Sequence, residues 1–516
     1  MKKFLAILLA AMMLLAVTAA FADEAATTYT ITINGGDAGH TYEAYQIFTG
    51  DLSGDVLSNI KLGNGVTNNV MTFEGTTYTD AAKLAEALNS ANIDAFAALA
   101  GANLSTKAGT STYNEETGAY TITGLQPGYY LVKDADDSVP ATHAYTKFIV
   151  KIVKDATATP KTDKTSHEKK VKENVKYTEN ATSDAGYQYG AGYNDVADYN
   201  IGDVVPFSLY SKVPDLTNFS AYKMVFHDKM SDGLTFDPAS VKVTIAGNEL
   251  TKDTDYILTY PATDGDTFDV TILNLVDLKA AKDATIRVDF NATLNEEAEI
   301  GLNGNPNQSK LEFSNNPNNT EDTTETPWDY VLVFTYELDV TKVDGADTTK
   351  KLAGAEFVLQ NANQAYAKLD ENNKVESWVT SIDDATVLVS GADGLFKVIG
   401  LDDGTYTLTE TKAPDGYNLL PNPITVKVEA TTTNGHSYAN KPEDALTALK
   451  IDVAGTKADG DMTTGIVGTT VTNNIGATLP ETGGIGTTLF YLFGGLMAAG
   501  SALILVVRRR ADADEE

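Results

Sequence analysis

Apolar and polar residues alternate along most of the chain, and this pattern predicts β-strands. The clearest strands are expected at residues 29–33, 120–122, 241–245, 285–290 and 424–428, each bounded by Gly, Asn, Asp or Pro. Alternate residues of a strand lie on opposite faces, so each of these strands can bury one face. We therefore expect a mainly β fold built of tandem β-sandwich domains.

Two segments break this alternation. Between Asp80 and Ala100 the apolar residues recur at helical spacing, which predicts one helix in the first domain. Residues 485–507 are apolar and long enough to cross a bilayer of roughly 30 Å as a helix. Residues 508–510 are all Arg, and positive charge on the cytoplasmic side predicts a C-terminal transmembrane helix with the preceding chain outside the cell.

The N-terminus has the pattern of a secretory signal peptide. Lys2 and Lys3 precede an apolar run at residues 4–20, and Ala20-Phe21-Ala22 supplies the small residues that signal peptidase recognises. We expect a secreted mature chain that begins at Asp23.

Composition excludes several classes of function. The chain has 71 acidic and 38 basic residues, a net charge of −33, and an acidic surface repels nucleic acid. It has no cysteine, so no disulfide can stabilise it. Five scattered histidines and acidic stretches without calcium-loop spacing predict no metal and no cofactor. The sequence also lacks the nucleophile elbow, phosphate loop and dinucleotide fingerprint of common enzymes.

A repeated segment helps to divide the chain. Residues 124–134 match residues 400–410 in their Gly, Leu and Tyr positions, which indicates a shared sandwich plan in the first and last domains. Polar linkers lie near residues 155–168 and 315–326, and a final strand at 330–337 extends the middle domain. The predicted parts are a signal peptide (1–22), an N-terminal domain (23–160), a middle domain (161–337), a C-terminal domain (338–476) and a C-terminal signal (477–516).

The segment Leu479-Pro480-Glu481-Thr482-Gly483 stands before the apolar span and the Arg tail. This arrangement resembles the LPXTG sorting signal of Gram-positive surface proteins. In that family a sortase, a cysteine transpeptidase, cleaves between the Thr and the Gly and transfers the threonyl group to an amine. The resemblance implies attachment to peptidoglycan at the cell wall.

The identity of that amine decides between a monomeric wall protein and a fibre. Residues 156–161 resemble the pilin motif of shaft pilins, in which a Tyr-Pro-Lys sequence presents the acceptor lysine. Thr159 stands in place of the tyrosine, and Lys161 is the expected acceptor. The alternative is that Lys161, near Lys164, is an ordinary solvated lysine of a linker.

Further resemblances cover nearly the whole mature chain. Segments that resemble the second domain of shaft pilins lie at residues 201–207, 226–236, 304–307 and 311–317. Segments that resemble the collagen-adhesin B-type domain, which has an Ig-like fold, lie at residues 338–344, 352–357 and 409–417. In these families a buried lysine amine attacks a buried asparagine carboxamide and releases ammonia, while an adjacent acid assists. Burial favours such chemistry because it lowers the pKa of an amine and raises the pKa of a carboxyl group.

In the C-terminal domain, Lys342 shares a strand face with apolar residues, which is an unusual place for a solvated charge. Glu410 is in phase with apolar residues of its own strand and is the expected assisting acid. The same phase argument selects Asn473 as the bond partner, with Asn474 as the out-of-phase alternative.

In the middle domain the same argument selects Lys169 as nucleophile, Asp228 as acid and Asn307 as bond partner. Lys170 remains an alternative to Lys169, and Asn315 remains an alternative to Asn307.

The first domain differs. Its Asp134 aligns with Glu410, but Ile33 stands where Lys342 would be, so we expect two intramolecular bonds and not three.

The sequence therefore predicts the major structural subunit of a covalent surface pilus, mechanically stabilised by Lys–Asn isopeptide bonds, and not an enzyme with turnover. Its expected partners are a class C (pilin) sortase, a housekeeping sortase, other copies of itself, accessory pilins and peptidoglycan. The alternative function is a monomeric wall-anchored adhesin, or a pilus-tip protein, that binds host matrix or glycan.

Overall fold

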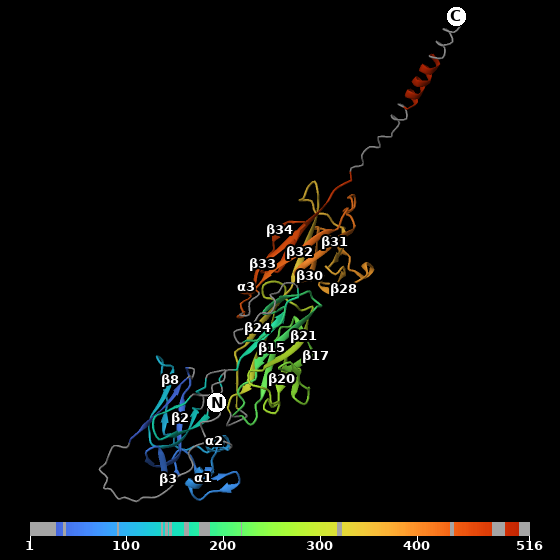
Figure 1. Cartoon of the computed structure of the whole chain (residues 1–516). Coiled ribbons are helices and arrows are strands. Elements are labelled where there is room, and N and C mark those ends of the chain that lie inside the picture. Colours follow the sequence, from blue (N-terminus) through green and yellow to red (C-terminus); the bar gives the residue numbers. More distant parts are fainter. Residues whose placement is uncertain are drawn as a thin grey trace, which may run out of the picture.

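The computed structural model describes residues 27–34, 38–89, 92–135, 138–139, 143, 147–158, 165–174, 186–217, 219–316, 322–433, 438–476 and 491–504. The described strands fall into three groups, which we call the first region (β1 to β11), the middle region (β12 to β24) and the third region (β25 to β35). Figure 1 shows the three regions in succession along an elongated molecule, with the helix at residues 491–504 at its far end.

The first region packs two sheets against each other. One sheet has the order β11-β1-β8-β7 and the other the order β10-β9-β2-β3, and buried residues such as Ile33, Tyr42 and Tyr120 fill the space between them. β1 pairs with β8 in antiparallel and with β11 in parallel orientation. The strands are β1 Tyr29–Asn34, β2 Tyr42–Ser53, β3 Val56–Leu62, β4 Thr72–Phe73, β5 Thr76–Thr77, β6 Gly109–Thr110, β7 Thr112–Asn114, β8 Ala119–Leu125, β9 Gly128–Asp134, β10 Lys147–Ile152 and β11 Ala156–Ala158.

Where one helix was expected, the described residues of the first region form two, α1 (Ala81–Ala87) and α2 (Ile93–Gly101), and a short 3-10 helix, η1 (Asn68–Met71). The side chain of Asn92 accepts a hydrogen bond from the Asn89 amide at 2.8 Å and donates one to the Ala87 carbonyl at 3.1 Å. Asparagine competes for backbone hydrogen bonds in this way, which accounts for the interruption. Both helices contribute to a core with buried residues of β2 and β9.

The middle region is a sandwich of two larger sheets. Their strand orders are β13-β12-β15-β21-β17-β18 and β14-β24-β22-β16-β20-β19, with β23 paired to β22. The strands are β12 His167–Lys172, β13 Tyr193–Asn194, β14 Val196–Asp198, β15 Val204–Lys212, β16 Met224–Met230, β17 Leu234–Ile245, β18 Asn248–Glu249, β19 Tyr256–Thr259, β20 Phe268–Ile272, β21 Thr285–Leu294, β22 Asn305–Ser314, β23 Thr323–Glu325 and β24 Asp329–Phe334.

The third region pairs a small sheet, β30-β25-β35, with a larger one, β28-β27-β26-β31-β32-β33-β34. Its first and last strands, β25 and β35, run parallel to each other. The elements are β25 Tyr336–Asp344, β26 Glu356–Gln360, β27 Tyr366–Leu369, β28 Val375–Val379, η2 Ile382–Asp384, β29 Leu388–Val389, β30 Leu395–Leu401, β31 Gly404–Lys412, β32 Ile424–Thr432, α3 Pro442–Ala445, β33 Leu446–Val453, β34 Thr456–Asp459 and β35 Ile466–Asn473.

The strand expected at residues 330–337 is divided at Thr335. Residues before this point belong to β24 of the middle region, and residues after it belong to β25 of the third. Thr335 is fully buried, and its hydroxyl donates to the Leu401 carbonyl at 3.3 Å. The chain therefore passes from one sandwich into the next inside a packed junction.

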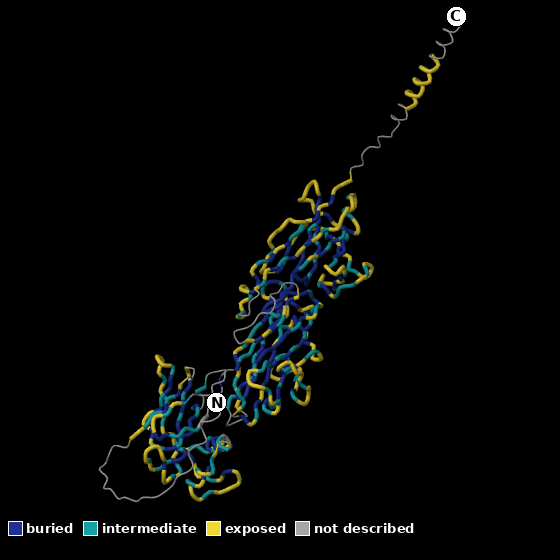
Figure 2. Tube along the Cα trace, in the orientation of Figure 1, coloured by how far each residue is buried: buried dark blue, intermediate teal, exposed yellow. Residues whose placement is uncertain are grey.

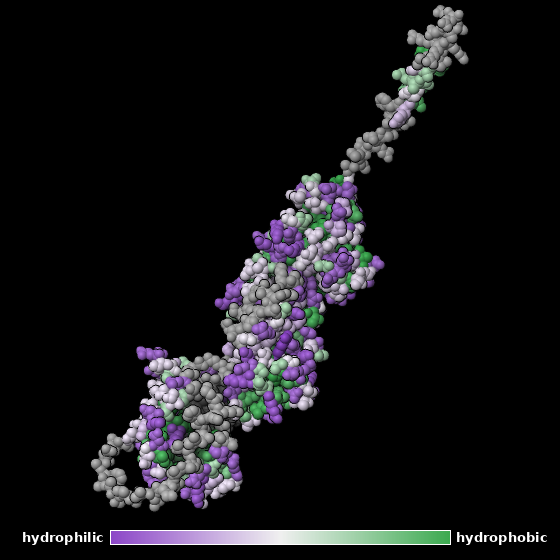
Figure 3. Space-filling view, viewed as in Figure 1, coloured by the Kyte–Doolittle hydropathy of each residue, from purple (hydrophilic) through white to green (hydrophobic). Residues whose placement is uncertain are grey.

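One hydrophobic core runs through the middle and third regions. Figure 2 shows buried residues along the interior of both regions, and Figure 3 shows many hydrophilic residues on the visible surface, in keeping with the strongly acidic composition. Gly301 and Gly465 meet at the junction with positive φ angles of 83° and 73°, and a Cβ on either would collide with the backbone of the other region. The two regions are thus closely packed against each other.

Candidate functional site

Lys342 lies on β25 with its side chain in the core of the third region. Leu338, Val340 and Lys342 are all buried, which confirms the predicted strand phase. Removal of the amine from water destabilises its charged form and lowers the pKa of Lys342 to about 8, although Glu410 opposes that shift. An amine in this setting is far more nucleophilic at neutral pH than a solvated lysine.

The parallel pairing of β25 with β35 brings Asn473 to this amine. Asp344 is the register partner of Asn473, and Lys342 Nζ hydrogen-bonds to Asn473 Oδ1. The Asn473 carboxamide is held by a donation from its Nδ2 to the Asn418 carbonyl at 2.8 Å. Asn473 is buried, whereas Asn474 is exposed, so the structure places the in-phase residue of the two candidates at the amine.

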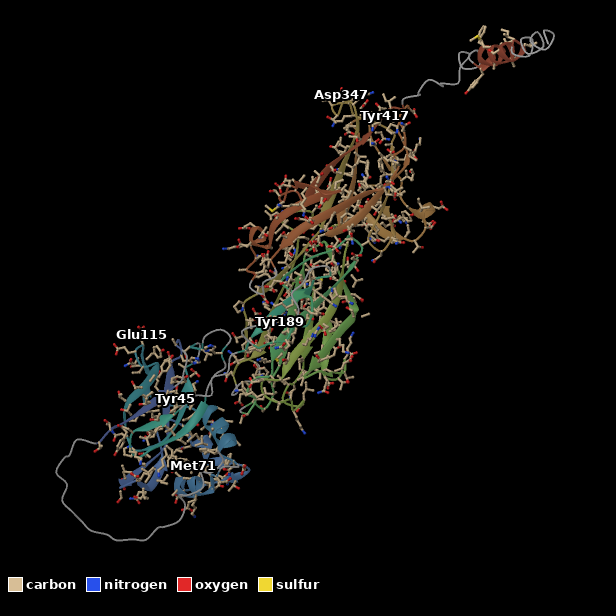
Figure 4. The ribbon with its side chains drawn as sticks, turned by 45° about the horizontal axis from the view of Figure 1, so that its top comes forward. Tyr45, Met71, Glu115, Tyr189, Asp347 and Tyr417 are labelled. Carbon is tan, nitrogen blue, oxygen red and sulfur yellow. The ribbon has the colours of Figure 1, made fainter. Side chains whose placement is uncertain are left out.

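The carboxyl group of Glu410, on β31, lies near both Lys342 Nζ and Asn473 Nδ2. Its Oε1 is 3.8 Å from Lys342 Nζ and makes no hydrogen bond, while its Oε2 accepts from Asn473 Nδ2 at 3.0 Å. The Leu420 amide also donates to Oε2, at 2.8 Å, and fixes the carboxyl group. One carboxyl group therefore faces both the amine and the amide nitrogen. Asp347 and Tyr417, labelled in Figure 4, mark this end of the third region: the Tyr417 hydroxyl donates to Asp344 at 2.7 Å.

In the middle region, Lys169 on β12 forms a hydrogen-bonded ion pair with Asp228 on β16. Both side chains are fully buried, and the Lys169 amine lies 5.4 and 5.0 Å from the ring centres of Phe207 and Phe290. Burial lowers the pKa of Lys169, although Asp228 opposes the shift. Burial also raises the pKa of Asp228 to about 6, against the opposing effect of Lys169.

Asn307, on β22, lies next to this pair. Its register partner on β16 is Met230, two residues along from Asp228, and its side chain is fully buried. The carboxamide contacts Asp228 without a hydrogen bond of ordinary geometry. Asn315 lies eight residues after Asn307, just beyond the end of β22. At 3.4 Å per residue this places it roughly 27 Å from Asn307. The structure therefore brings Asn307, and not Asn315, to Asp228.

Lys170, the alternative nucleophile, points away from Asp228. Its Nζ pairs with Asp195 at 2.8 Å and lies 5.1 Å from the ring centre of Tyr189, which is labelled in Figure 4. Burial would lower the pKa of Lys170, but Asp195 and Asp329 outweigh this effect and raise it. Lys170 therefore stays charged, and a charged amine is not a nucleophile.

The first region places a different group beside its acid. Asp134 and Ile33 are both buried, but Asp134 Oδ1 is 2.6 Å from His40 Nδ1, and His40 Nε2 is 2.9 Å from His143 Nδ1. Sequence analysis missed both histidines. They lie 103 residues apart, and no local spacing connects them.

Several predicted residues lie outside the described part of the chain. These are the signal peptide, the acceptor Lys161, the segment from Leu479 to Gly483 and both ends of the predicted span at 485–507. Residues 491–504 of that span are helical. Among the described residues, no helix has both the length and the apolar character needed to cross a membrane.

Three family models match the chain. A model of the Gram-positive pilin backbone subunit 2, Cna-B-like domain, matches residues 201–317, and a model of a prealbumin-like fold domain matches residues 336–442. A model of the LPXTG cell wall anchor motif matches residues 471–514.

Curated relatives agree with these matches. The trypsin-resistant surface T6 protein of Streptococcus pyogenes serotype M6 is 25% identical over 375 residues, which cover 60% of this chain and 65% of the relative. Fimbrial subunit type 2 of Actinomyces naeslundii is 27% identical over 249 residues, or 43% of this chain and 46% of the relative. The chain thus spans less than two thirds of the length of these relatives.

Solved structures show the same fold. The T6 backbone pilin of serotype M6 Streptococcus pyogenes superimposes with a TM-score of 0.56 at 18% identity, over 88% of this chain and all of that one. The full-length major pilin SpaD of Corynebacterium diphtheriae gives a TM-score of 0.50 at 20% identity, over 87% and 98% of the two chains.

These findings define a protein with tandem pilin-type β domains and an LPXTG cell wall anchor motif. Within that class, the matched segments are similar to Gram-positive pilus backbone subunits and to the cell wall anchor motif.

Proposed function

We propose that the chain is the major structural subunit of a covalent pilus, in which each of its two last domains carries one Lys–Asn isopeptide bond. A sortase joins Thr482 of one copy to a lysine of the next, with Lys161 favoured, and a final transfer attaches the fibre to peptidoglycan. The domains are 23–160, 161–335 and 336–476, with the last boundary moved from residue 337 to Thr335, where the strand is divided, and they lie between a cleaved signal peptide and the sorting signal at 477–516. The similarity to pilus backbone subunits supports this assembly.

One observation carries the bond-forming part of the proposal: a buried amine, a buried carboxamide and a buried acid meet in the third region. The neutral Lys342 Nζ attacks Cγ of Asn473, a new N–C bond forms, and the bond from Cγ to Nδ2 breaks. Glu410 is placed to move the proton, because its Oε1 faces the attacking nitrogen and its Oε2 already holds the departing one. The leaving group departs as ammonia, and Glu410 is regenerated.

The middle region supports the same reaction with a shorter acid. Asp228 Oδ2 is hydrogen-bonded to the Lys169 amine and receives its proton directly, and the raised pKa of Asp228 favours this transfer. The adjacent Asn307 carboxamide then accepts the neutral amine. Each reaction happens once in the life of a chain, so the acids assist a single event and not a catalytic cycle.

Intact-mass measurement of the mature chain tests both bonds. We expect the chain to be lighter than its sequence by two ammonia masses, and Lys342→Ala to restore one of them. Lys350→Ala is a matched control, because Lys350 is a half-exposed lysine of the same region that donates to Tyr417 at 2.8 Å. A mature chain with the full mass encoded by its gene would refute the bonds.

Polymer formation tests the fibre separately. In cells that carry the pilin sortase, Lys161→Ala should leave the protein as monomers, while Lys164→Ala, three residues away in the same linker, should keep the ladder of high-mass polymers. A full ladder from Lys161→Ala would identify another acceptor lysine. If Lys161→Ala abolishes the ladder while the monomer still lacks two ammonia masses, polymerisation and internal bonding are independent.

A further inference from the structure

Four acidic side chains are buried together where the middle and third regions meet. Glu173 follows β12, Asp198 ends β14, and Asp402 and Asp403 form the turn between β30 and β31. Each is only 1–5% exposed. This junction is separate from both candidate bond sites.

The carboxylates converge on one point. One oxygen each from Asp198, Asp402 and Asp403 lies within 4.8 Å of the other two. Calcium binds oxygen at 2.3–2.6 Å, so two ligands on opposite sides of the ion are roughly 4.8 Å apart. A single calcium ion can therefore contact all three carboxylates with little movement of the chain.

Neighbouring groups hold the outer oxygens of these carboxylates. Asp198 Oδ2 accepts from the Tyr336 hydroxyl at 3.1 Å, and Asp402 Oδ2 accepts from Asn174 Nδ2 at 3.0 Å. The Asp402 amide donates to Asn200 Oδ1 at 3.0 Å, which fixes the turn. Hydrogen bonds of this kind orient the ligands in metal sites. The other oxygen of Asp402, Oδ1, makes no hydrogen bond although the residue is 5% exposed.

A buried carboxylate oxygen without a hydrogen bond is destabilising, because it has lost its contact with water, and a bound cation would compensate for that loss.

We propose that Asp198, Asp402 and Asp403 bind a calcium ion that links the middle and third regions. The donors are all oxygens, which favours a hard cation over zinc or copper. Calcium also tolerates irregular coordination by six to eight oxygens, whereas magnesium demands near-octahedral geometry and retains water, which a buried site accommodates poorly. Glu173 is near enough to add a fourth carboxylate, because its Oε2 accepts from the Asp198 amide at 3.2 Å.

The test uses the full chain, stripped with EDTA and then given CaCl2 alone. We expect elemental analysis to find about one more calcium ion per wild-type chain than per Asp402→Asn chain. At a hundredfold excess of calcium over Kd, the shared transition of the middle and third regions should rise by roughly 5–10 °C. Asp459→Asn removes an exposed carboxylate of β34 and controls for loose binding to the acidic surface.

The Asp402→Asn variant separates an ion site from a structural hydrogen bond. Without calcium its melting temperature should exceed that of the wild type, because one of the repelling charges is gone, and calcium should no longer raise it. A variant that melts lower in EDTA, or that keeps the calcium response, overturns the proposal, as does a wild type that binds no more calcium than the variant. None of these measurements depends on polymerisation, so they stand apart from the pilus proposal.

Discussion

The third and first regions place an acid at corresponding points of related sandwiches and surround it differently. Glu410 on β31 is the register partner of Phe357, and Asp134 on β9 is the register partner of Tyr42. In both regions the opening strand pairs in parallel with the closing strand, β25 with β35 and β1 with β11. Beside Glu410 lie an amine and a carboxamide, whereas beside Asp134 lies the imidazole of His40.

This comparison separates what the fold provides from what the chemistry requires. The sandwich supplies a buried acid in either case, and the neighbouring side chains decide whether that acid can assist a reaction. The prediction that Ile33 takes the strand position of Lys342 is wrong: Ile33 pairs with Tyr120 as Val340 pairs with Phe396, and the counterpart of Lys342 lies outside the described residues. The acid of the first region is part of a hydrogen-bonded chain of two histidines.

The largest effect that we predict comes from the acid of the third region. Glu410→Ala should prevent bond formation, restore one ammonia mass and destabilise the third region by about 2–4 kcal/mol, by analogy with a disulfide that closes a long loop. Intact mass and calorimetry measure the two outcomes. Glu356→Ala, which removes a partly exposed acid from β26, should leave the loss of two ammonia molecules unchanged. Normal bond formation in Glu410→Ala would show that the acid is dispensable.

Asp134→Ala should act through packing alone. It leaves His40 without its buried acceptor, so we expect a loss of about 1–3 kcal/mol from the stability of the first region. The number of ammonia molecules lost by the chain should stay at two. Thermal melting and intact mass together check this result, and Asp51→Ala, at an exposed position, is the control. A change in the number of ammonia molecules lost would reveal a bond in the first region and remove the contrast with the third.

Bond formation should slow at low pH in both reactive regions, but over different ranges of pH. In the third region the neutral form of Lys342 attacks, so the rate should rise about tenfold per pH unit below pH 8 and level off above it. The middle region should slow below about pH 6, where Asp228 and Lys169 are both protonated. Refolding from denaturant with ammonia loss followed by mass measures both rates. A third-region rate that does not change between pH 6 and pH 8 would contradict attack by the neutral Lys342 amine.

The smallest effect should come from Asn474. Its side chain is exposed, so Asn474→Ala should keep the bond and change stability by no more than about 0.5 kcal/mol. The same substitution at Asn473 should abolish one ammonia loss. Peptide mapping of the cross-link distinguishes the two, and a bond to Asn474 would contradict the strand phase.

Strand phase explains why much of the third-region geometry could be predicted. Lys342, Glu410 and Asn473 are each in step with apolar neighbours, and a one-residue shift would turn each of them to the other face. The middle region gave a weaker signal, because Lys169 and Lys170 are adjacent and both buried. Only the positions of Asp228 and Asp195 distinguish them, and these come from other strands.

Contacts between distant segments were beyond prediction. The two histidines of the first region, and the carboxylates Asp198 and Asp402, are brought together by the fold and have no local spacing in the sequence. The helix expected at residues 80–100 was interrupted for the opposite reason. There, a local side-chain hydrogen bond at Asn92 overrode an apolar periodicity that continued through the break.

The parallel register of β25 and β35 has a consequence for length. Lys342 and Asn473 are 131 residues apart in the chain. A fully extended segment of that size would span roughly 450 Å. With the proposed bond closed, a pull on the two ends of the third region passes directly from β25 to β35. The segment between Lys342 and Asn473 is then not extended by the pull. In a filament joined through Lys161 and Thr482, the two regions that carry such bonds would therefore have almost nothing left to unravel.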